Sequence, residues 1–232
     1  MMNKKVFLVI GASRGIGKAL VEIIAKDPNN SVIALARSKH SLENYFDGFS
    51  NVHSDFIDLQ SDSLKEDLSN VLNSYDRIDY MINNAGKLVN KPFLELTQED
   101  FDTCYQINAI GVMKSVQVAV PKMLAFGGHV VNISTVGAFQ GSVKFPGLTA
   151  YSTSKAAVTS FTELFSEEYK KTKITMNCLC LGAVQTEMLE EAFPGYKASI
   201  SAESMAKYIY DFTTTAHKYM SGKIIPVSLS TP

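Results

Sequence analysis

The sequence has few cysteines, almost no net charge and no long apolar run. Its 232 residues include only Cys104, Cys178 and Cys180, and an odd number, with two of the three in one apolar run, does not indicate a disulfide framework. The formal net charge of -1 argues against the basic surface that binds nucleic acids or membranes. No stretch approaches the roughly 20 apolar residues of a membrane helix. We expect a cytoplasmic protein without a nucleic-acid or membrane partner.

The chain also lacks low-complexity segments, internal repeats, and linkers rich in Pro, Gly or Ser. The length suits one α/β domain with a large core, so a single domain is predicted over residues 1–232. No metal-ligand set is predicted. The apolar run Val6–Ile10 follows two lysines, is too short for a signal-peptide core and leads directly into a glycine turn, so we interpret it as a strand.

Short apolar runs alternate with longer amphipathic segments along the chain. The apolar runs are rich in Val, Ile and Leu, as in strands buried on both faces. They predict strands at Val6–Ile10, Ser31–Ala36, Val52–Ile57, Ile78–Ile82, His129–Ile133, Ile174–Cys180 and Lys223–Val227. Helices are predicted at Gly15–Lys26, Ser63–Leu72, Gln98–Ala125 (opened by a capping box at Thr97–Asp100), Tyr151–Lys171 and Ala202–Thr213. This order indicates right-handed βαβ units and an α/β fold with a doubly wound parallel, Rossmann-type sheet.

A glycine-rich turn follows the first predicted strand. Gly11, Gly15 and Gly17 have the spacing G-x-x-x-G-x-G between that strand and a helix. Gly11 can form a turn that residues with a Cβ resist, Gly15 lets the backbone approach a pyrophosphate, and Gly17 lets the helix pack on the strand. The helix N-terminus offers N–H groups to phosphates. The turn predicts a dinucleotide site, with an ordinary turn as the alternative; its other residues are Ser13, Arg14 and Ile16.

With the motifs that follow it, this spacing resembles the short-chain dehydrogenase/reductase family. The resemblance extends from Val6 to about Val227. Its motifs, in the family's order, are Gly11–Gly17, Asn83–Gly86, Asn108, Asn132–Thr135, Tyr151–Lys155 and Gly182–Thr186. It implies a nicotinamide-dependent oxidoreductase that forms a homodimer or homotetramer through the helices predicted at 98–125 and 151–171.

The end of the second predicted strand bears on the choice of nicotinamide cofactor. NAD-binding folds usually place an acid there for the ribose 2′-hydroxyl, but this chain has Ala36. Arg37 follows it, and Arg14 lies in the glycine turn, so two guanidinium groups can flank a 2′-phosphate. NADP(H) is therefore favoured over NAD(H), with two solvated surface arginines as the alternative.

The resemblance implies further cofactor contacts at the ends of the other strands. Asp58 and Leu59 match the adenine contact, although a shifted register would give this role to Asp55 and Phe56. The family's proline before the sixth-strand glycine is replaced by Leu181. The remaining contacts are Asn84, Ala85 and Gly86 at the ribose, and Gly182, Val184 and Thr186 at the carboxamide.

Tyr151 and Lys155 open a predicted helix and share one of its faces. A neighbouring ammonium favours the phenolate and lowers the pKa of tyrosine from its usual value near 10, as does the oxidised nicotinamide ring. Tyr151 is thus expected to be the general acid or base. The resemblance adds that Lys155 binds the nicotinamide ribose. It also implies that Asn108 holds a water in a proton relay. The alternative is that Asn108 is a polar residue tolerated between helices.

In the family, a hydroxyl at the end of the fifth strand binds the substrate oxygen. Thr135 matches that position, with Ser134 as the alternative on the opposite strand face. The segment between Thr135 and Tyr151 is longer than is usual in the family, so familiar substrates cannot be assumed. An apolar face on the segment after Thr186 suits a modest apolar substrate; it consists of Met188, Leu189, Phe193 and Tyr196.

The leading interpretation is an NADPH-dependent carbonyl reductase acting on a small carbonyl substrate. An alcohol dehydrogenase working toward the ketone would use the same residues. A catalytically weak NADPH-binding protein that senses redox state or regulates a partner is the alternative from another class, because Rossmann domains are reused in that way.

Overall fold

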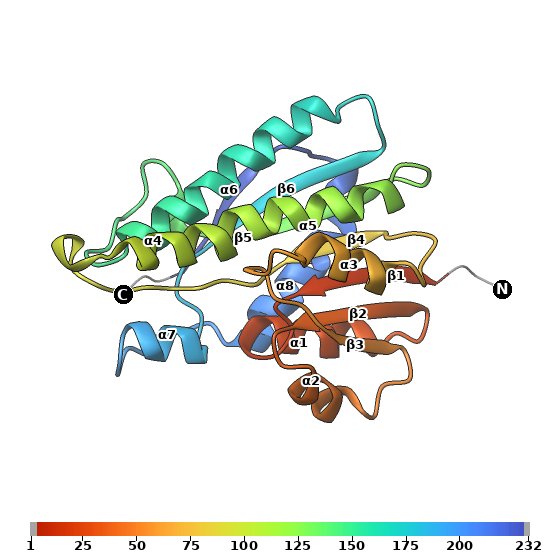
Figure 1. Cartoon of the computed structure of the whole chain (residues 1–232), viewed down its shortest axis with the longest axis horizontal. Coiled ribbons are helices and arrows are strands. Elements are labelled where there is room, and N and C mark those ends of the chain that lie inside the picture. Colours follow the sequence, from red (N-terminus) through yellow and green to blue (C-terminus); the bar gives the residue numbers. More distant parts are fainter. Residues whose placement is uncertain (1–3, 230–232) are drawn as a thin grey trace.

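A parallel sheet runs through the computed structural model, which describes residues 4–229 (Figure 1). Within those residues seven strands pair in the order β3-β2-β1-β4-β5-β6-β7. Their bounds are β1 Lys5–Ile10, β2 Asn30–Ala36, β3 Val52–Phe56, β4 Tyr80–Asn83, β5 Gly128–Thr135, β6 Ile174–Leu181 and β7 Ile224–Val227. The predicted doubly wound parallel sheet is confirmed.

The strand order reverses between β1 and β4, where chain segments leave the sheet in opposite directions. In the register, Ile10 pairs with Leu35 of β2 and with Asn83 of β4, and Asn83 pairs with Asn132 of β5. The carboxyl ends of these strands are therefore level. Ligands of open α/β sheets bind at this switch point, which is where the glycine turn follows Ile10.

Helices cover both faces of the sheet. Their bounds are α1 Gly15–Ala25, α2 Lys39–Phe46, α3 Leu64–Leu72, α4 Gln98–Tyr105, α5 Gly111–Ala119, α6 Thr149–Glu168, α7 Glu187–Ala192 and α8 Ala202–Thr215. Helices α1 and α8 pack on one face, and α3, α5 and α6 pack on the other (Figure 1). Alternate residues of β1 supply both cores, with Phe7 and Val9 on one side and Leu8 and Ile10 on the other.

The long helix predicted over 98–125 is interrupted. Its start is as predicted, because Thr97 Oγ1 accepts from Asp100 N at 3.2 Å and the Asp100 carboxylate accepts from Thr97 N at 3.0 Å. A π-helical turn at Gln106–Ile110 then separates α4 from α5, and a 3₁₀ turn at Val120–Lys122 ends the segment. The apolar spacing alone did not indicate this extra residue per turn.

Two short helices were not predicted. Ser38 caps α2 by accepting from Ser41 N, and Thr186 caps α7 by accepting from Leu189 N. Both helices are too short to show a clear apolar period, so only their capping residues signalled them. No helix of the described residues is long and apolar enough to cross a membrane, and the three cysteines are free and buried.

A buried histidine lies at the amino end of β5. His129 is fully buried; its Nδ1 is 2.9 Å from Thr213 O and its Nε2 is 2.9 Å from Asn177 Nδ2. A neutral ring with its proton on Nδ1 satisfies both contacts, whereas a second proton would face the Asn177 amide. Burial lowers the pKa of His129 to about 4, with a smaller contribution from nearby His217.

We expect this histidine to make the protein acid-sensitive. The folded pKa of about 4 lies below the value of 6.5 for a free histidine, so the unfolded chain binds the proton first as the pH falls. The stabilisation is fully present above about pH 6.5 and is lost toward pH 4, on the order of 3 kcal/mol. Urea unfolding at pH 7, 5.5 and 4.5 should show His129→Gln losing less stability than the unmodified protein. Equal losses would contradict the assignment.

Candidate active site

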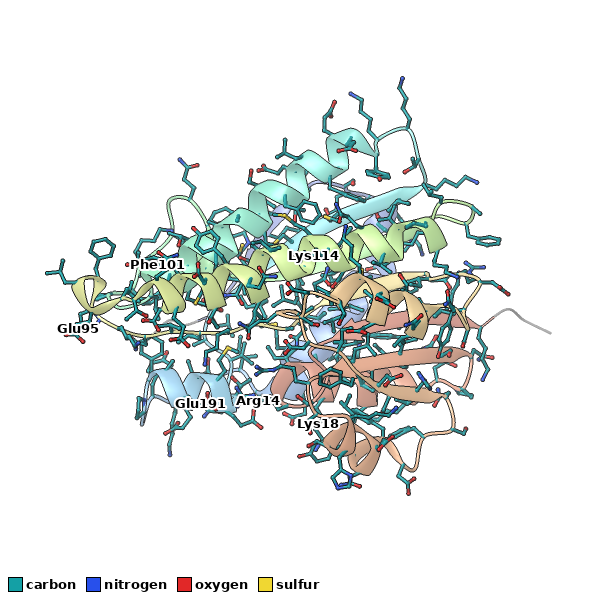
Figure 2. All side chains as sticks on the ribbon, viewed as in Figure 1. Arg14, Lys18, Glu95, Phe101, Lys114 and Glu191 are labelled. Carbon is teal, nitrogen blue, oxygen red and sulfur yellow. The ribbon has the colours of Figure 1, made fainter. Side chains whose placement is uncertain are left out.

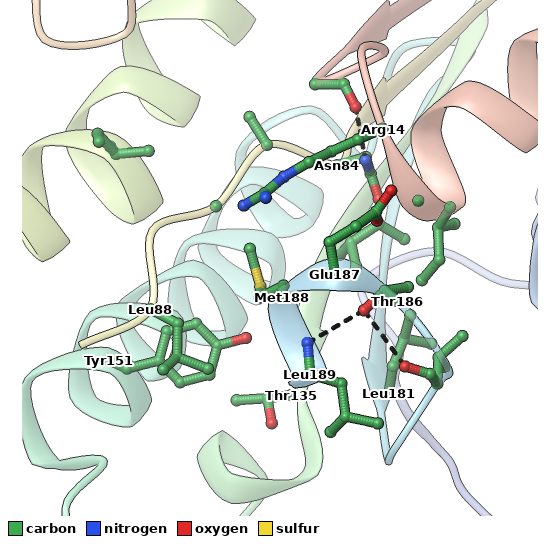
Figure 3. A pocket seen from close by; sticks show the side chains of 18 of the residues that line it. Arg14, Asn84, Leu88, Thr135, Tyr151, Leu181, Thr186, Glu187, Met188 and Leu189 are labelled. Atoms are coloured by element: carbon green, nitrogen blue, oxygen red, sulfur yellow. Dashed lines mark hydrogen bonds between the residues drawn. The ribbon is translucent and has the colours of Figure 1, made fainter. Parts of the chain in front are cut away.

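A pocket of about 570 Å³ lies at the carboxyl ends of the strands, with α7 along one side (Figure 3). Most residues predicted for the site line it: Gly11, Ser13, Arg14, Gly15, Ile16, Arg37, Asp58, Leu59, Asn84, Ala85, Gly86, Ser134, Thr135, Tyr151, Lys155, Gly182, Val184 and Thr186. Gly17 and Asn108 are not among the lining residues and support it from behind. Asp55 and Phe56 do not line it either; Asp55 instead accepts from Lys39 Nζ at 3.0 Å.

The glycine turn brings β1, β4 and α1 closer together than side chains would allow. A Cβ on Gly11, whose φ is +92°, would lie 2.5 Å from Ala85 N, and a Cβ on Gly17 would lie 1.9 Å from Gly11 O. Helix α1 begins at Gly15, its N-cap Arg14 makes no side-chain capping bond, and its first turn has no acidic residue. The exposed N–H groups and the close backbone approach fit a pyrophosphate.

The two arginines predicted to flank a 2′-phosphate have different surroundings. Arg37 is exposed at the edge of the pocket after buried Ala36. Arg14 instead reaches α7, where its Nη1 lies 2.6 Å from Glu191 Oε1 (Figure 2). This hydrogen bond raises the pKa of Arg14 and lowers that of Glu191. Arg14 thus has a carboxylate partner in this structure, and its expected contact with a 2′-phosphate stays a prediction.

Tyr151 and Lys155 lie in the first turns of α6 and both line the pocket. Lys155 is 3% exposed, and its Nζ donates to Ile133 O at 2.9 Å and to Ala85 O at 3.3 Å. Burial lowers the pKa of Lys155 to about 8 and raises the pKa of Tyr151 to about 12. Burial dominates at the phenol while two carbonyls hold the ammonium, and the lowering of the Tyr151 pKa that we expect from Lys155 and the nicotinamide ring stays a prediction.

The two hydroxyls at the end of β5 have different partners. Ser134 is buried, and its Oγ donates to Lys155 O at 3.1 Å. Thr135 Oγ1 accepts from Gly137 N at 3.2 Å and lies in the pocket near Tyr151 (Figure 3). Among residues 4–229 no acceptor takes the Thr135 proton, so this hydroxyl can donate to a ligand while Ser134 ties β5 to α6.

Asn108 occupies the π-helical turn between α4 and α5. It is fully buried; its Oδ1 accepts from Lys87 N at 2.8 Å, and its Nδ2 donates to Lys87 O and to Ser154 Oγ, each at 2.9 Å. Its side chain therefore fixes the segment after β4 to α6. A Cβ on Gly86 would stand 3.4 Å from Lys155 Nζ and 3.5 Å from Asn108 Oδ1, so both side chains border the position of Gly86. Turns of this kind are frequent at functional sites.

Several pocket residues were not singled out from the sequence. Helix α7 contributes Glu187 and Ala192, and other segments contribute Leu88 and Leu148. Glu191, the partner of Arg14, borders the site from the same helix. The sequence carried no signal for Glu191, because its role depends on where the unpredicted helix α7 lies.

A doubly wound sheet with this glycine turn and a Tyr–Lys pair at its carboxyl edge defines a nicotinamide-dependent oxidoreductase of the Rossmann type. A family model described as short chain dehydrogenase matches residues 5–197. The chain belongs to the short-chain dehydrogenase/reductase family, whose enzymes use NAD or NADP. The family resemblance and fold predicted from the sequence are confirmed.

Individual relatives span more than one kind of reductase. The chain is 30% identical to 3-oxoacyl-acyl-carrier-protein reductase FabG of Aquifex aeolicus, covering 98% of this chain and 97% of that one. It is 31% identical to hydroxynaphthalene reductase-like protein Arp2 of Metarhizium brunneum, covering 80% and 70%. A solved short chain dehydrogenase/reductase family protein, 22% identical, superposes with a TM-score of 0.87 over 98% of this chain and 97% of that one.

The contact between Gly17 and Gly11 generates a prediction about cofactor binding. Gly17→Ala would place a methyl against the Gly11 carbonyl, so the turn must shift away from the geometry that receives a pyrophosphate. We expect the affinity for a nicotinamide dinucleotide, measured by titration calorimetry, to fall at least about tenfold, equivalent to about 1.4 kcal/mol.

Gly48→Ala is the matched control, because a Cβ there meets nothing within 4 Å. It should bind the cofactor like the unmodified protein. Unchanged binding in Gly17→Ala, with the variant folded by circular dichroism, would show that the turn does not hold the cofactor.

Proposed function

We propose that the protein is an NADPH-dependent carbonyl reductase that acts on a small carbonyl compound. The observation that carries the proposal is that Tyr151, Lys155 and Thr135 line the same pocket as the uncapped start of α1. The nicotinamide, when bound, supplies the hydride. Loss of NADPH absorbance with a panel of aldehydes, ketones and diketones tests the proposal. NADPH binding without turnover of any carbonyl would favour a sensor or regulatory protein instead.

The cofactor would lie along the carboxyl edge of the sheet. Backbone N–H groups at Gly15 and Ile16 would hold the pyrophosphate, and Asp58 with Leu59 would border the adenine. Asn84, Ala85, Gly86 and Lys155 would contact the nicotinamide ribose, and Gly182, Val184 and Thr186 the carboxamide. Thr186 has a second task, because its hydroxyl accepts from Leu189 N at 3.3 Å and so caps α7.

Tyr151 would act as the general acid in the reductive direction. With a pKa near 12 its phenol carries a proton at neutral pH, which is the form needed to protonate a carbonyl oxygen as negative charge builds there. The ammonium of Lys155, one helical turn away, would stabilise the phenolate that remains. Asn108 would keep Lys155 in reach of solvent through the water that the family resemblance implies.

Thr135 would orient the substrate oxygen and stabilise its developing charge. Removing one such donor typically costs about 10²–10³ in rate, and the loss falls on kcat more than on KM because the bond strengthens in the transition state. We therefore expect Thr135→Ala to be nearly inactive while binding NADPH normally, and Thr135→Ser to stay active because it keeps the hydroxyl.

The neighbouring hydroxyl and the phenol provide the comparison variants. Ser134→Ala should retain most of its kcat, since Ser134 donates to Lys155 O, and Tyr151→Phe should lose activity. Steady-state kinetics checks these expectations. An active Thr135→Ala beside an inactive Ser134→Ala would move the role to Ser134, and if neither matters while Tyr151→Phe does, neither hydroxyl is the donor.

The preference for NADPH rests on Arg37 beside Ala36, where no carboxylate would repel a 2′-phosphate. Arg37→Asp should reverse the preference toward NADH. Glu191→Gln releases Arg14 from its ion pair, and because an exposed pair contributes at most about 1 kcal/mol, NADPH should bind up to about fivefold more tightly with NADH unaffected. Fluorescence titration of both cofactors measures this. Equal affinities of the unmodified protein for NADPH and NADH would refute the preference.

The proposal includes a cytoplasmic homo-oligomer, dimeric or tetrameric. Helix α6 supports the assembly, because Val158 and Phe165 are buried in the core while Leu164 on the same helix is 68% exposed and Phe161 is half-buried. This apolar surface exceeds what the core covers. The three free thiols suit a reducing compartment.

A further inference from the structure

Two phenylalanine rings meet over the substrate end of the pocket. Phe145 comes from the loop after β5 and Phe193 follows α7, and both line the pocket. Their ring centroids are 6.4 Å apart at an interplanar angle of 66°. A methyl built on Gly137 would stand 3.7 Å from both Phe145 Cδ2 and Thr135 Oγ1. The ring of Phe145 and the hydroxyl proposed to bind the substrate oxygen therefore border the same position beside Gly137.

The segments that carry these rings are fastened to the same short stretch after β4. Asn90 Nδ2 donates to Ala192 O at 2.9 Å, next to Phe193. Lys91 N donates to Gly147 O at 3.0 Å, close to Phe145. Gly147 has a φ of +83°, and a Cβ there would stand 2.1 Å from Asn90 Oδ1, so only glycine fits this contact. The two rings are thus held in place by the protein itself.

The loop of Phe145 has a further attachment. Lys144 Nζ donates to Gly137 O at 2.9 Å and to Phe139 O at 2.6 Å. Its ammonium holds the loop together, so it is not directed at a ligand. This contact strengthens the case for a preformed aromatic wall.

The remaining wall at this end of the pocket is apolar. It is formed by Leu88, Leu148, Met188, Leu189 and Ala192. Each cation lining the described pocket has another partner or lies away from this end. Lys155 donates to two carbonyls and is proposed to contact the ribose, Arg14 pairs with Glu191, and Arg37 lies after β2. A carboxylate or phosphate on the substrate would therefore lose its hydration here without gaining a partner.

We infer that the substrate is an uncharged ketone, or the matching alcohol, that carries an aromatic ring within one or two carbons of the reacting carbon. The ring packs against Phe145 and Phe193 while Thr135 and Tyr151 engage the oxygen. Edge-to-face packing on two fixed rings favours a flat π system over a saturated ring of equal size. This inference rests on the proposed reductase function and adds its substrate class.

Phenylacetone and cyclohexylacetone test the inference, because they differ in the ring alone and neither ring is conjugated with the carbonyl. Apolar burial alone would favour the more hydrophobic cyclohexyl compound. We expect the kcat/KM of the unmodified protein with NADPH to favour phenylacetone by about three- to tenfold. Phe145→Leu and Phe193→Leu should bring that ratio close to one, because leucine keeps the apolar surface and removes the ring.

Phe93→Leu is the matched control, since Phe93 is exposed and does not line the pocket; it should keep the ratio of the unmodified protein. A ratio of one or below in the unmodified protein would overturn the inference, as would an unchanged ratio in both pocket variants. Butane-2,3-dione distinguishes a failure of the substrate class from a failure of the proposed function. If it is reduced while phenylacetone is not preferred over cyclohexylacetone, the aromatic substrate class alone is wrong. If none of the three carbonyl compounds is reduced, the proposed reductase function is wrong as well.

Discussion

The contact of Gly17 with the carbonyl of Gly11 is the constraint on which the site depends. A Cβ on Gly17 would stand 1.9 Å from that oxygen, so a side chain has no room there. The first turn of α1 therefore lies directly against the end of β1. Gly11 in turn lies against the backbone of Ala85 after β4. The start of a helix and the ends of two neighbouring strands are thereby brought to one point, and the N–H groups that fit a phosphate are directed along the edge of the sheet.

A second set of contacts, between side chains and backbone carbonyls, is centred on Lys155 at the catalytic end of the pocket. Its carbonyl accepts from Ser134 Oγ, and its ammonium donates to Ile133 O and Ala85 O. One residue of α6 is thus bound to β5 and to the segment after β4. Tyr151 lies one helical turn before Lys155, and Thr135 directly follows Ser134, so both are close in the chain to these contacts. Preorganised donors of this kind need no rearrangement during a reaction.

The features predicted correctly from the sequence are those that depend on local patterns. The strands, the glycine turn, the Tyr–Lys spacing and the capping box at Thr97 all depend on residues close together in the chain, and the structure has them. The π-helical turn at Asn108 and the short helix α7 depend on packing between distant segments, so the apolar period did not show them. The pairing of Arg14 with Glu191 and the burial of Tyr151 could not be predicted for the same reason. The first depends on the position of α7, and the second depends on how the surrounding segments pack.

Helix α7 connects the two ends of the pocket. With six residues it is far too short to be stable alone, so its position depends on its attachments. Thr186 caps its start, Glu191 reaches Arg14 in the glycine turn, and Asn90 holds the carbonyl of Ala192 at its end. Each attachment involves a different part of the pocket: the residues proposed to hold the carboxamide, the phosphate loop, and the wall of Phe193. A change in cofactor contact at Arg14 or Thr186 therefore acts on the same helix that positions the substrate wall. The proposed cofactor site and the proposed substrate site both include α7, and attachments from both sites hold this helix in place.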